Sequence, residues 1–147
     1  MTKITVIMQI RKILWGILVD LYPSYLRWVY GMDIGKNCRI SWKAHLDKSV
    51  NPKGIHIGEN TWVLSGAVIL SHDHCRGLKT DTYIGNDCVI GMRSIILPGL
   101  IIGNQVVIGG GSIVTKNIPS NCIAAGNPAR VLKQGICVRK GKIIKES

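Results

Sequence analysis

Two histidines in a short segment are the clearest candidates for chemistry in this sequence. His72 and His74 flank Asp73. A neutral imidazole has a pKa of about 6.5, so it can accept a proton from a hydroxyl group at neutral pH. Two other interpretations stay open, a solvated polar loop and half of a metal site, because a His-x-His pair supplies only part of the ligand set that zinc needs. The remaining histidines, His45 and His56, lack a matching spacing, so no metal is expected.

A catalytic imidazole also needs a group that holds its orientation. Asp73 lies between the two histidines, but it points away from both if the segment is extended, because successive side chains alternate. Asp47, Glu59 or a backbone carbonyl are the other candidates for this orienting group.

Aliphatic residues recur every six residues through most of the chain, and this period decides the expected fold. The positions are Ile34, Ile40, Leu46, Ile57, Val63, Ile69, Ile84, Ile90, Ile96, Ile102, Ile108 and Val114. A small or β-branched residue follows most of them four positions later, for example Cys38, Val50 and Ser112. The period fits neither an α-helix nor a hairpin meander, but it fits short strands joined by tight turns, three to each coil. The sequence therefore predicts an all-β protein, a parallel β-helix of about four coils.

Two interruptions of the six-residue spacing predict loops. Leu46 and Ile57 are eleven residues apart, and Ile69 and Ile84 are fifteen residues apart. The second interruption contains both candidate histidines. Loops that leave a rigid scaffold often carry the functional groups of a protein. We therefore expect the chemistry to lie in the second loop, residues 71–83.

The segments on either side of the repeat differ from it in composition. Residues 3–30 are rich in aliphatic and aromatic side chains and are expected to form one or two short helices, with Pro23 ending or bending the first. This segment is expected to cap the open end of the β-helix, to form a subunit contact, or to lie at a membrane surface, where Trp, Tyr and basic residues are favoured. We divide the chain into a helical cap or membrane-interface segment at 1–33, a β-helix domain at 34–133 and a basic tail at 134–147.

The formal net charge of +11 favours anionic partners such as a phosphorylated cofactor, a lipid-linked sugar or an acidic membrane face. Nucleic acid is not expected, because no recognition helix or aromatic RNA-binding signature occurs. The five cysteines are widely spaced without a CxxC pair, which suits a reducing cytoplasm and predicts no disulfide framework. No signal peptide is recognised, so the expected location is cytoplasmic, at the inner face of the membrane if residues 3–30 bind it.

Two stretches of the sequence resemble a known family. The run IGNDCVIGMRSIILPGLIIGNQVVIGGGSIVTKNI and the segment AAGNPARVLK resemble the hexapeptide-repeat acyltransferases, in particular the galactoside, maltose and polysaccharide O-acetyltransferases. The resemblance covers roughly residues 34–133. It implies a left-handed β-helix and a homotrimer with active sites between subunits. It also implies direct transfer of an acetyl group from acetyl-CoA to a sugar hydroxyl, without an acyl-enzyme.

The same resemblance implies roles for individual residues. The essential histidine of such families lies at the sixth position of the interrupted hexapeptide, which here is His74. Some relatives carry a similar pair, so His72 is the alternative base. The residues expected to bind acetyl-CoA are Met92, Gly110, Ser112, Thr115, Lys116, Arg130 and Lys133. Among these, Arg130 and Lys133 would pair with the CoA phosphates as charge-assisted donors, and Met92 stands where the compared relatives have serine.

The expected function is therefore an O-acetyltransferase acting on a small-molecule or lipid-linked sugar in cell-surface polysaccharide biosynthesis. An N-acetyltransferase acting on an amino sugar would use the same cofactor and base. A non-catalytic β-helix scaffold is the alternative from a different class. The histidine loop together with the Asn-Pro-Ala-Arg segment favours the enzyme, because a scaffold has no physical need for both.

Overall fold

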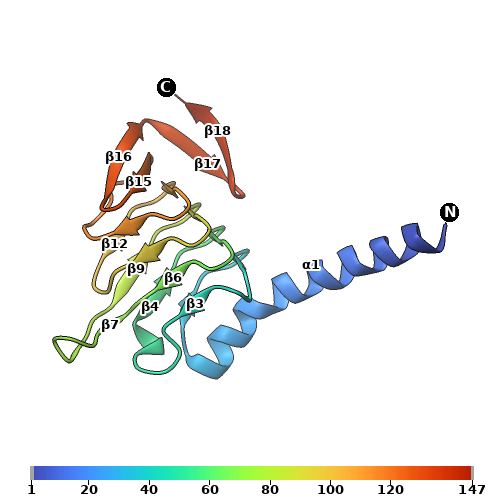
Figure 1. The fold of residues 1–147 in the computed structure, drawn as a ribbon, viewed down its shortest axis with the longest axis horizontal. Coiled ribbons are helices and arrows are strands. Elements are labelled where there is room, and N and C mark those ends of the chain that lie inside the picture. Colours follow the sequence, from blue (N-terminus) through green and yellow to red (C-terminus); the bar gives the residue numbers. More distant parts are fainter. Residues whose placement is uncertain (1, 147) are drawn as a thin grey trace.

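A computed structural model describes residues 2–146, and its body is a prism of short parallel strands (Figure 1). Face A holds β1 (Asp33–Ile34), β4 (Ile55–Ile57), β9 (Thr82–Ile84) and β12 (Ile101–Ile102). Face B holds β2 (Arg39–Ile40), β5 (Trp62–Val63), β10 (Val89–Ile90), β13 (Val107–Ile108), β15 (Cys122–Gly126) and β16 (Ala129–Gln134). Face C holds β3 (His45–Leu46), β6 (Val68–Ile69), β11 (Ile95–Ile96) and β14 (Ile113–Val114). Successive strands visit the three faces in turn, which makes four coils of a left-handed parallel β-helix and confirms the predicted fold.

The six-residue period builds the core of the prism. All twelve aliphatic residues of the repeat are buried, and each is the last residue of its strand. Because side chains alternate along a strand, the residue before each of them points outward. The small residues four positions later are buried too, except Val50, which is exposed because it lies in the loop between β3 and β4. The interior positions predicted from the period are otherwise confirmed.

Glycines at the corner between faces A and B allow the coils to stack closely. A Cβ atom on Gly85 would lie 2.5 Å from the carbonyl oxygen of Gly103 in the next coil. Real Cβ atoms essentially never approach backbone this closely, so the corner requires glycine for packing. The Gly85 N–H donates to the Ile102 carbonyl at 2.9 Å, which continues the ladder through the corner.

A single helix, α1 (Lys3–Tyr30), precedes the prism. It continues through Pro23, so Pro23 does not divide the segment into two helices. Burial of Pro23 and Leu26 against the first coil, and hydrogen bonds from Arg27 to the carbonyls of Ile34 and Gly35 at 2.9 and 3.0 Å, hold this end of the helix in place. The N-terminal part projects away from the prism (Figure 1). No helix among residues 2–146 is long and apolar enough to cross a membrane.

Three antiparallel strand pairs and a short helix interrupt or follow the coils. The first interruption holds the 3-10 helix η1 (Pro52–Gly54), and the second holds the antiparallel pair β7 (His72–Asp73) and β8 (Leu78–Lys79). At the C-terminal end, β16 folds back on β15, and β17 (Ile136–Arg139) pairs with β18 (Lys142–Glu146). The basic tail is thus a β-hairpin, which the sequence analysis did not predict.

Candidate active site

His72 lies at the corner where face C meets face A. The residue follows the end of β6 by three positions, and Asp47 follows β3 at the same corner, because Leu46 pairs in register with Ile69. The Nδ1 atom of His72 forms a hydrogen bond with Oδ2 of Asp47. The Asp47 side chain is 1% exposed and that of His72 is 22% exposed, so the pair joins a buried carboxylate to a ring that solvent can reach.

Further hydrogen bonds fix the carboxylate of Asp47. The hydroxyl of Ser71 donates to Oδ2 at 3.0 Å, and the Val50 N–H donates to Oδ1 at 3.2 Å. Burial raises the pKa of Asp47, but the hydrogen bonds from His72, Val50 and Ser71 outweigh this and hold the pKa below its usual value. An ionised Asp47 accepts the Nδ1 proton of His72, which leaves Nε2 with a free lone pair.

His74 lies farther along the hairpin and is exposed. Within residues 2–146 its side chain has no hydrogen-bonding partner. Asp73 accepts hydrogen bonds from the N–H of Arg76 at 3.1 Å and from Nη1 of Arg76 at 3.0 Å, so it orients neither histidine, as the extended geometry predicts. Only His72 of the two candidates has an orienting carboxylate, and of the candidate orienting groups Asp47 is the one beside it.

The expected cofactor-binding residues divide between two corners. Met92 and Gly110 lie at the corner between faces B and C in successive coils, where Gly111 N–H donates to the Met92 carbonyl at 2.8 Å. Thr115 and Lys116 follow β14 at the corner that carries His72, two coils farther along, and both are exposed. The two groups therefore flank face C.

The remaining three expected cofactor-binding residues have different environments. Ser112 is buried, and its hydroxyl accepts the Gly126 N–H at 3.1 Å. Arg130 is exposed, and its Nη1 donates to the carbonyl of its neighbour Ala129 at 3.1 Å. Lys133 forms an ion pair with Glu146 on β18. Of the two basic residues, Arg130 keeps most of its guanidinium donors available, whereas Lys133 already has an acidic partner.

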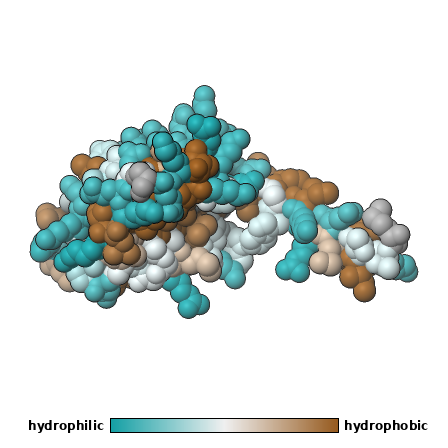
Figure 2. Space-filling model, turned by 90° about the horizontal axis from the view of Figure 1, so that it is seen from above, coloured by the Kyte–Doolittle hydropathy of each residue, from teal (hydrophilic) through white to brown (hydrophobic). Residues whose placement is uncertain are grey.

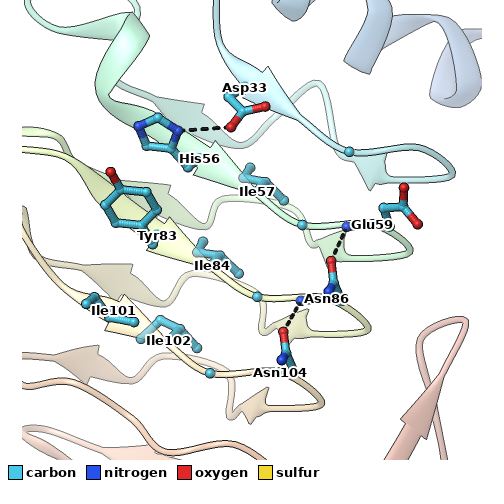
Figure 3. A pocket seen from close by; sticks show the side chains of 14 residues that line it. Asp33, His56, Ile57, Glu59, Tyr83, Ile84, Asn86, Ile101, Ile102 and Asn104 are labelled. Carbon is cyan, nitrogen blue, oxygen red and sulfur yellow. Dashed lines mark hydrogen bonds and ion pairs between the residues drawn. The ribbon is translucent and has the colours of Figure 1, made fainter.

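A groove of about 490 Å³ runs along face A and its corner with face B (Figure 3). One rim carries the outward residues of three successive strands, His56, Tyr83 and Ile101, and the other carries Glu59, Asn86 and Asn104. Side-chain-to-backbone hydrogen bonds stiffen the second rim, since Asn86 accepts the Glu59 N–H at 2.7 Å and Asn104 accepts the Asn86 N–H at 2.8 Å. Gly58, Gly85 and Gly103 lie between the two rims, and because they have no side chains the groove stays open.

The rim nearest His72 combines aromatic rings with carboxylates. His56 stacks on Tyr83 with ring centroids 4.4 Å apart and an interplanar angle of 10°. His56 Nδ1 lies 3.1 Å from Oδ2 of Asp33, and Nε2 lies 3.3 Å from Oδ2 of Asp81. Asp81 belongs to the loop that carries His72. Sequence reasoning missed this cluster, although the residue before each buried aliphatic on face A would have identified its outward members.

Residues 2–146 contain no group of three or more His, Cys, Asp and Glu side chains placed to hold a metal ion. The histidines at positions 72 and 56 have carboxylate neighbours instead.

Comparisons with known proteins agree with this architecture. The family described as bacterial transferase hexapeptide (six repeats) matches residues 81–116. Galactoside O-acetyltransferase of Escherichia coli (strain K12) is 55% identical over 121 residues, which cover 76% of this chain and 58% of that protein. Putative acetyltransferase YvoF of Bacillus subtilis (strain 168) is 31% identical over 114 residues, covering 76% of this chain and 63% of the relative. The chain thus spans about three-fifths of the length of these two relatives.

A solved structure supports the same assignment. The crystal structure of a maltose O-acetyltransferase from Clostridium difficile 630 superposes with a TM-score of 0.61 at 31% sequence identity. The match covers 74% of this chain and 72% of that one. Together with the repeat and the stacked coils, these relationships show that the chain belongs to the hexapeptide-repeat acyltransferases, the family of the galactoside and maltose O-acetyltransferases.

Proposed function

We propose that this chain transfers an acetyl group from acetyl-CoA to a hydroxyl group of a sugar, with His72 as the general base. The observation that carries this proposal is the pairing of His72 Nδ1 with the buried Asp47 carboxylate, which leaves Nε2 free to accept a proton. A hydroxyl group is a weak nucleophile, so its proton must be removed as its oxygen attacks the thioester carbonyl. Asp47 is the positioning residue for this step.

The proposed reaction proceeds by direct attack. The acceptor oxygen bonds to the acetyl carbon while Nε2 of His72 takes the hydroxyl proton, and the carbonyl oxygen becomes an oxyanion held by a backbone N–H. When the carbon–sulfur bond breaks, the imidazolium returns the proton to the departing CoA sulfur. The ionised Asp47 stabilises the imidazolium that forms between these two events. No acyl-enzyme is formed.

Acetyl-CoA is the proposed donor, because the relatives described above are named as acetyltransferases. The backbone at Gly110 has no side chain to keep a ligand away, and Met92 lies beside it at the same corner. We assign the pantetheine arm to this corner and to the exposed Thr115 and Lys116. The free donors of Arg130 suit a CoA phosphate, whereas Lys133 would first have to leave Glu146.

A saccharide is the proposed acceptor, and the groove on face A is the proposed place for it. Stacked rings at Tyr83 and His56 offer an apolar platform for the flat side of a sugar, and carboxylates at Asp33 and Asp81 accept hydrogen bonds from its hydroxyls. Two similar proteins are named for activity on galactoside and maltose. We further propose a lipid-linked acceptor in cell-surface polysaccharide synthesis, at the cytoplasmic face of the membrane.

A homotrimer with active sites between subunits is the proposed assembly. The outward positions of face C include Val68, Ile95 and Ile113, which are half-buried in the single chain. Such an apolar strip between the two corners that carry the candidate site is suited to contact with a second copy. Acetyl-CoA lying along that contact would bring both groups of cofactor-binding residues within reach of His72.

The test is acetyl transfer to a panel of sugars, monitored by release of free CoA thiol and by the mass of the acceptor. We expect thiol release that depends on acceptor, together with an acceptor heavier by one acetyl group per thiol released. Binding of CoA without turnover on any sugar would exclude the sugars tested as acceptors. A chain that does not bind CoA at all would refute the acetyltransferase assignment.

A further inference from the structure

The projecting part of α1 exposes an unusual amount of apolar surface. Six aliphatic side chains are between 56% and 71% exposed, namely Ile4, Ile7, Ile13, Leu14, Leu18 and Leu21. Val19 and Tyr22 are partly buried, and the first fully buried residue of the helix is Pro23. Figure 2 shows hydrophobic surface along the projecting helix, away from the body of the molecule. Isolated exposed apolar residues are normal, but a contiguous surface of this kind marks an interaction site.

The polar residues of this part of the helix gather on one narrow stripe. Successive residues turn by about 100° around a helix axis, so residues three or four apart lie on the same side. The stripe contains Thr5, Gln9, Lys12, Gly16 and Asp20. The rest of the circumference is apolar except for Lys3 and Arg11. A helix that is apolar around most of its circumference is stable only when that surface is buried against an apolar partner or phase.

The charges on the helix favour a bilayer over further copies of the chain as the partner of this apolar face. Lys3, Arg11 and Lys12 precede the first acidic residue of the chain, Asp20, and the whole chain carries a net charge of +11. A parallel bundle of copies would bring these like charges together and would bury Arg11 without a carboxylate partner. At a bilayer, the stem of Arg11 can lie among acyl chains while its guanidinium reaches the phosphate layer. Trp15, which is half exposed, is a residue type favoured at that depth.

We infer that the apolar face of α1 from Ile4 to Leu21 docks on the surface of a bilayer that contains anionic lipids. The apolar side chains enter the boundary between headgroups and acyl chains, and the three basic residues contact lipid phosphates. On the polar stripe, Thr5 and Gln9 face water, and Asp20 faces Arg39 of the prism at 3.9 Å. The Pro23–Tyr30 part of the helix, which is fixed to the first coil, then holds the prism beside the membrane. This inference depends on the helix alone and not on the proposed acetyl transfer.

The experiment is co-sedimentation of the full chain with vesicles of phosphatidylcholine alone or of phosphatidylcholine mixed with phosphatidylglycerol. We expect binding to the mixed vesicles, weaker binding as salt is added, and a blue shift of tryptophan fluorescence on binding. The variant Ile7→Glu/Leu14→Glu should weaken binding by at least about tenfold, because it places two charges on the apolar face. The matched control is Thr5→Glu/Gln9→Glu, which adds the same charge on the water-facing stripe and should retain most of the binding.

Three outcomes would overturn the inference. The first is equal binding of both variants, since the apolar face would then not be the docking surface. The second is binding that is the same for neutral and anionic vesicles at every salt concentration. The third is absence of wild-type binding combined with a smaller oligomeric mass of Ile7→Glu/Leu14→Glu, because the face would then be an interface between copies of the chain. Because all four substituted residues are exposed, circular dichroism should show unchanged folding in both variants.

Discussion

Replacing Asp47 by Asn removes the charge that orients His72 while keeping the shape of the side chain. The amide can donate a hydrogen bond to Nδ1 of His72, which would place the ring proton on Nε2 and remove the lone pair that accepts the acceptor proton. General base catalysis contributes about 10²–10⁴-fold to the rate. We therefore expect kcat to fall by about 10²–10⁴-fold, or roughly 3–5 kcal/mol of transition-state stabilisation.

The same substitution also has a cost in stability that can be separated from its effect on catalysis. The introduced amide would be matched less well to the donors of Val50 and Ser71, each of which now bonds to a carboxylate oxygen of Asp47. Hydrogen bonds to charged groups contribute about 1.5–3 kcal/mol each, so a loss of roughly 2 kcal/mol, or about 4–8 °C in Tm, is expected. In the wild-type protein the pKa of Asp47 is lowered by folding, so the ionised carboxylate stabilises the folded state. This stabilisation is fully present above about pH 4 and is lost as the pH falls through the lowered pKa.

The assay is CoA thiol release under saturating acetyl-CoA, with thermal unfolding measured in parallel. Asp73→Asn is the matched control, since it makes the same chemical change in the same loop at a carboxylate that bonds to Arg76 instead of a histidine. We expect the KM for acetyl-CoA to stay near the wild-type value in the Asp47 variant. A smaller folded fraction would also lower the apparent kcat without changing KM, so the parallel unfolding measurement must show that the variant is folded. A folded Asp47→Asn protein with kcat within a factor of two of wild type would show that Asp47 does not position the base.

Three further predictions concern acceptor binding in the groove, the stability of glycine variants and the labelling of cysteines. Tyr83→Ala should raise the KM for a sugar acceptor by about tenfold, whereas Tyr83→Phe should leave it nearly unchanged, and steady-state kinetics with varied acceptor distinguish the two. Gly85→Ala should destabilise the fold by about 1–3 kcal/mol in urea unfolding because its Cβ would strike the next coil, whereas Gly16→Ala in the exposed helix should stabilise it by about 0.5–1 kcal/mol. A maleimide reagent near neutral pH should label the exposed Cys75 and not the buried Cys88, whose pKa burial raises to about 11, as peptide mapping would show.

The coils could be predicted because their cause is local and repeated. One aliphatic residue in six faces the interior, and that rule holds from Ile34 to Val114. The helix α1 was predicted only in outline, because the effect of Pro23 depends on its burial against the first coil. The C-terminal hairpin follows no repeat, and contacts with distant residues support it: a Cβ atom on Gly141 at its tip would lie 2.5 Å from the ring of Trp62.

The candidate site could be predicted only in part, because the residue that orients the histidine is distant in the sequence. Position within the hexapeptide indicated His74, but the orienting carboxylate comes from a different coil and contacts His72. That pairing depends on the register between β3 and β6, which carries Asp47 and Ser71 to one corner. Counting from the buried Leu46 and Ile69 places both polar residues just after the ends of paired strands. The aromatic pair in the groove likewise depends on register: His56 and Tyr83 are 27 residues apart in the sequence but lie opposite each other on the neighbouring strands β4 and β9.

The assignment of the catalytic base is tested by comparing His72→Ala with His74→Ala in the acceptor-dependent thiol-release assay. Both proteins should bind CoA and remain folded. We predict that kcat/KM falls by at least about 10²-fold in His72→Ala and stays within a few fold of wild type in His74→Ala. A collapse of activity in His74→Ala alone would contradict the assignment of the base.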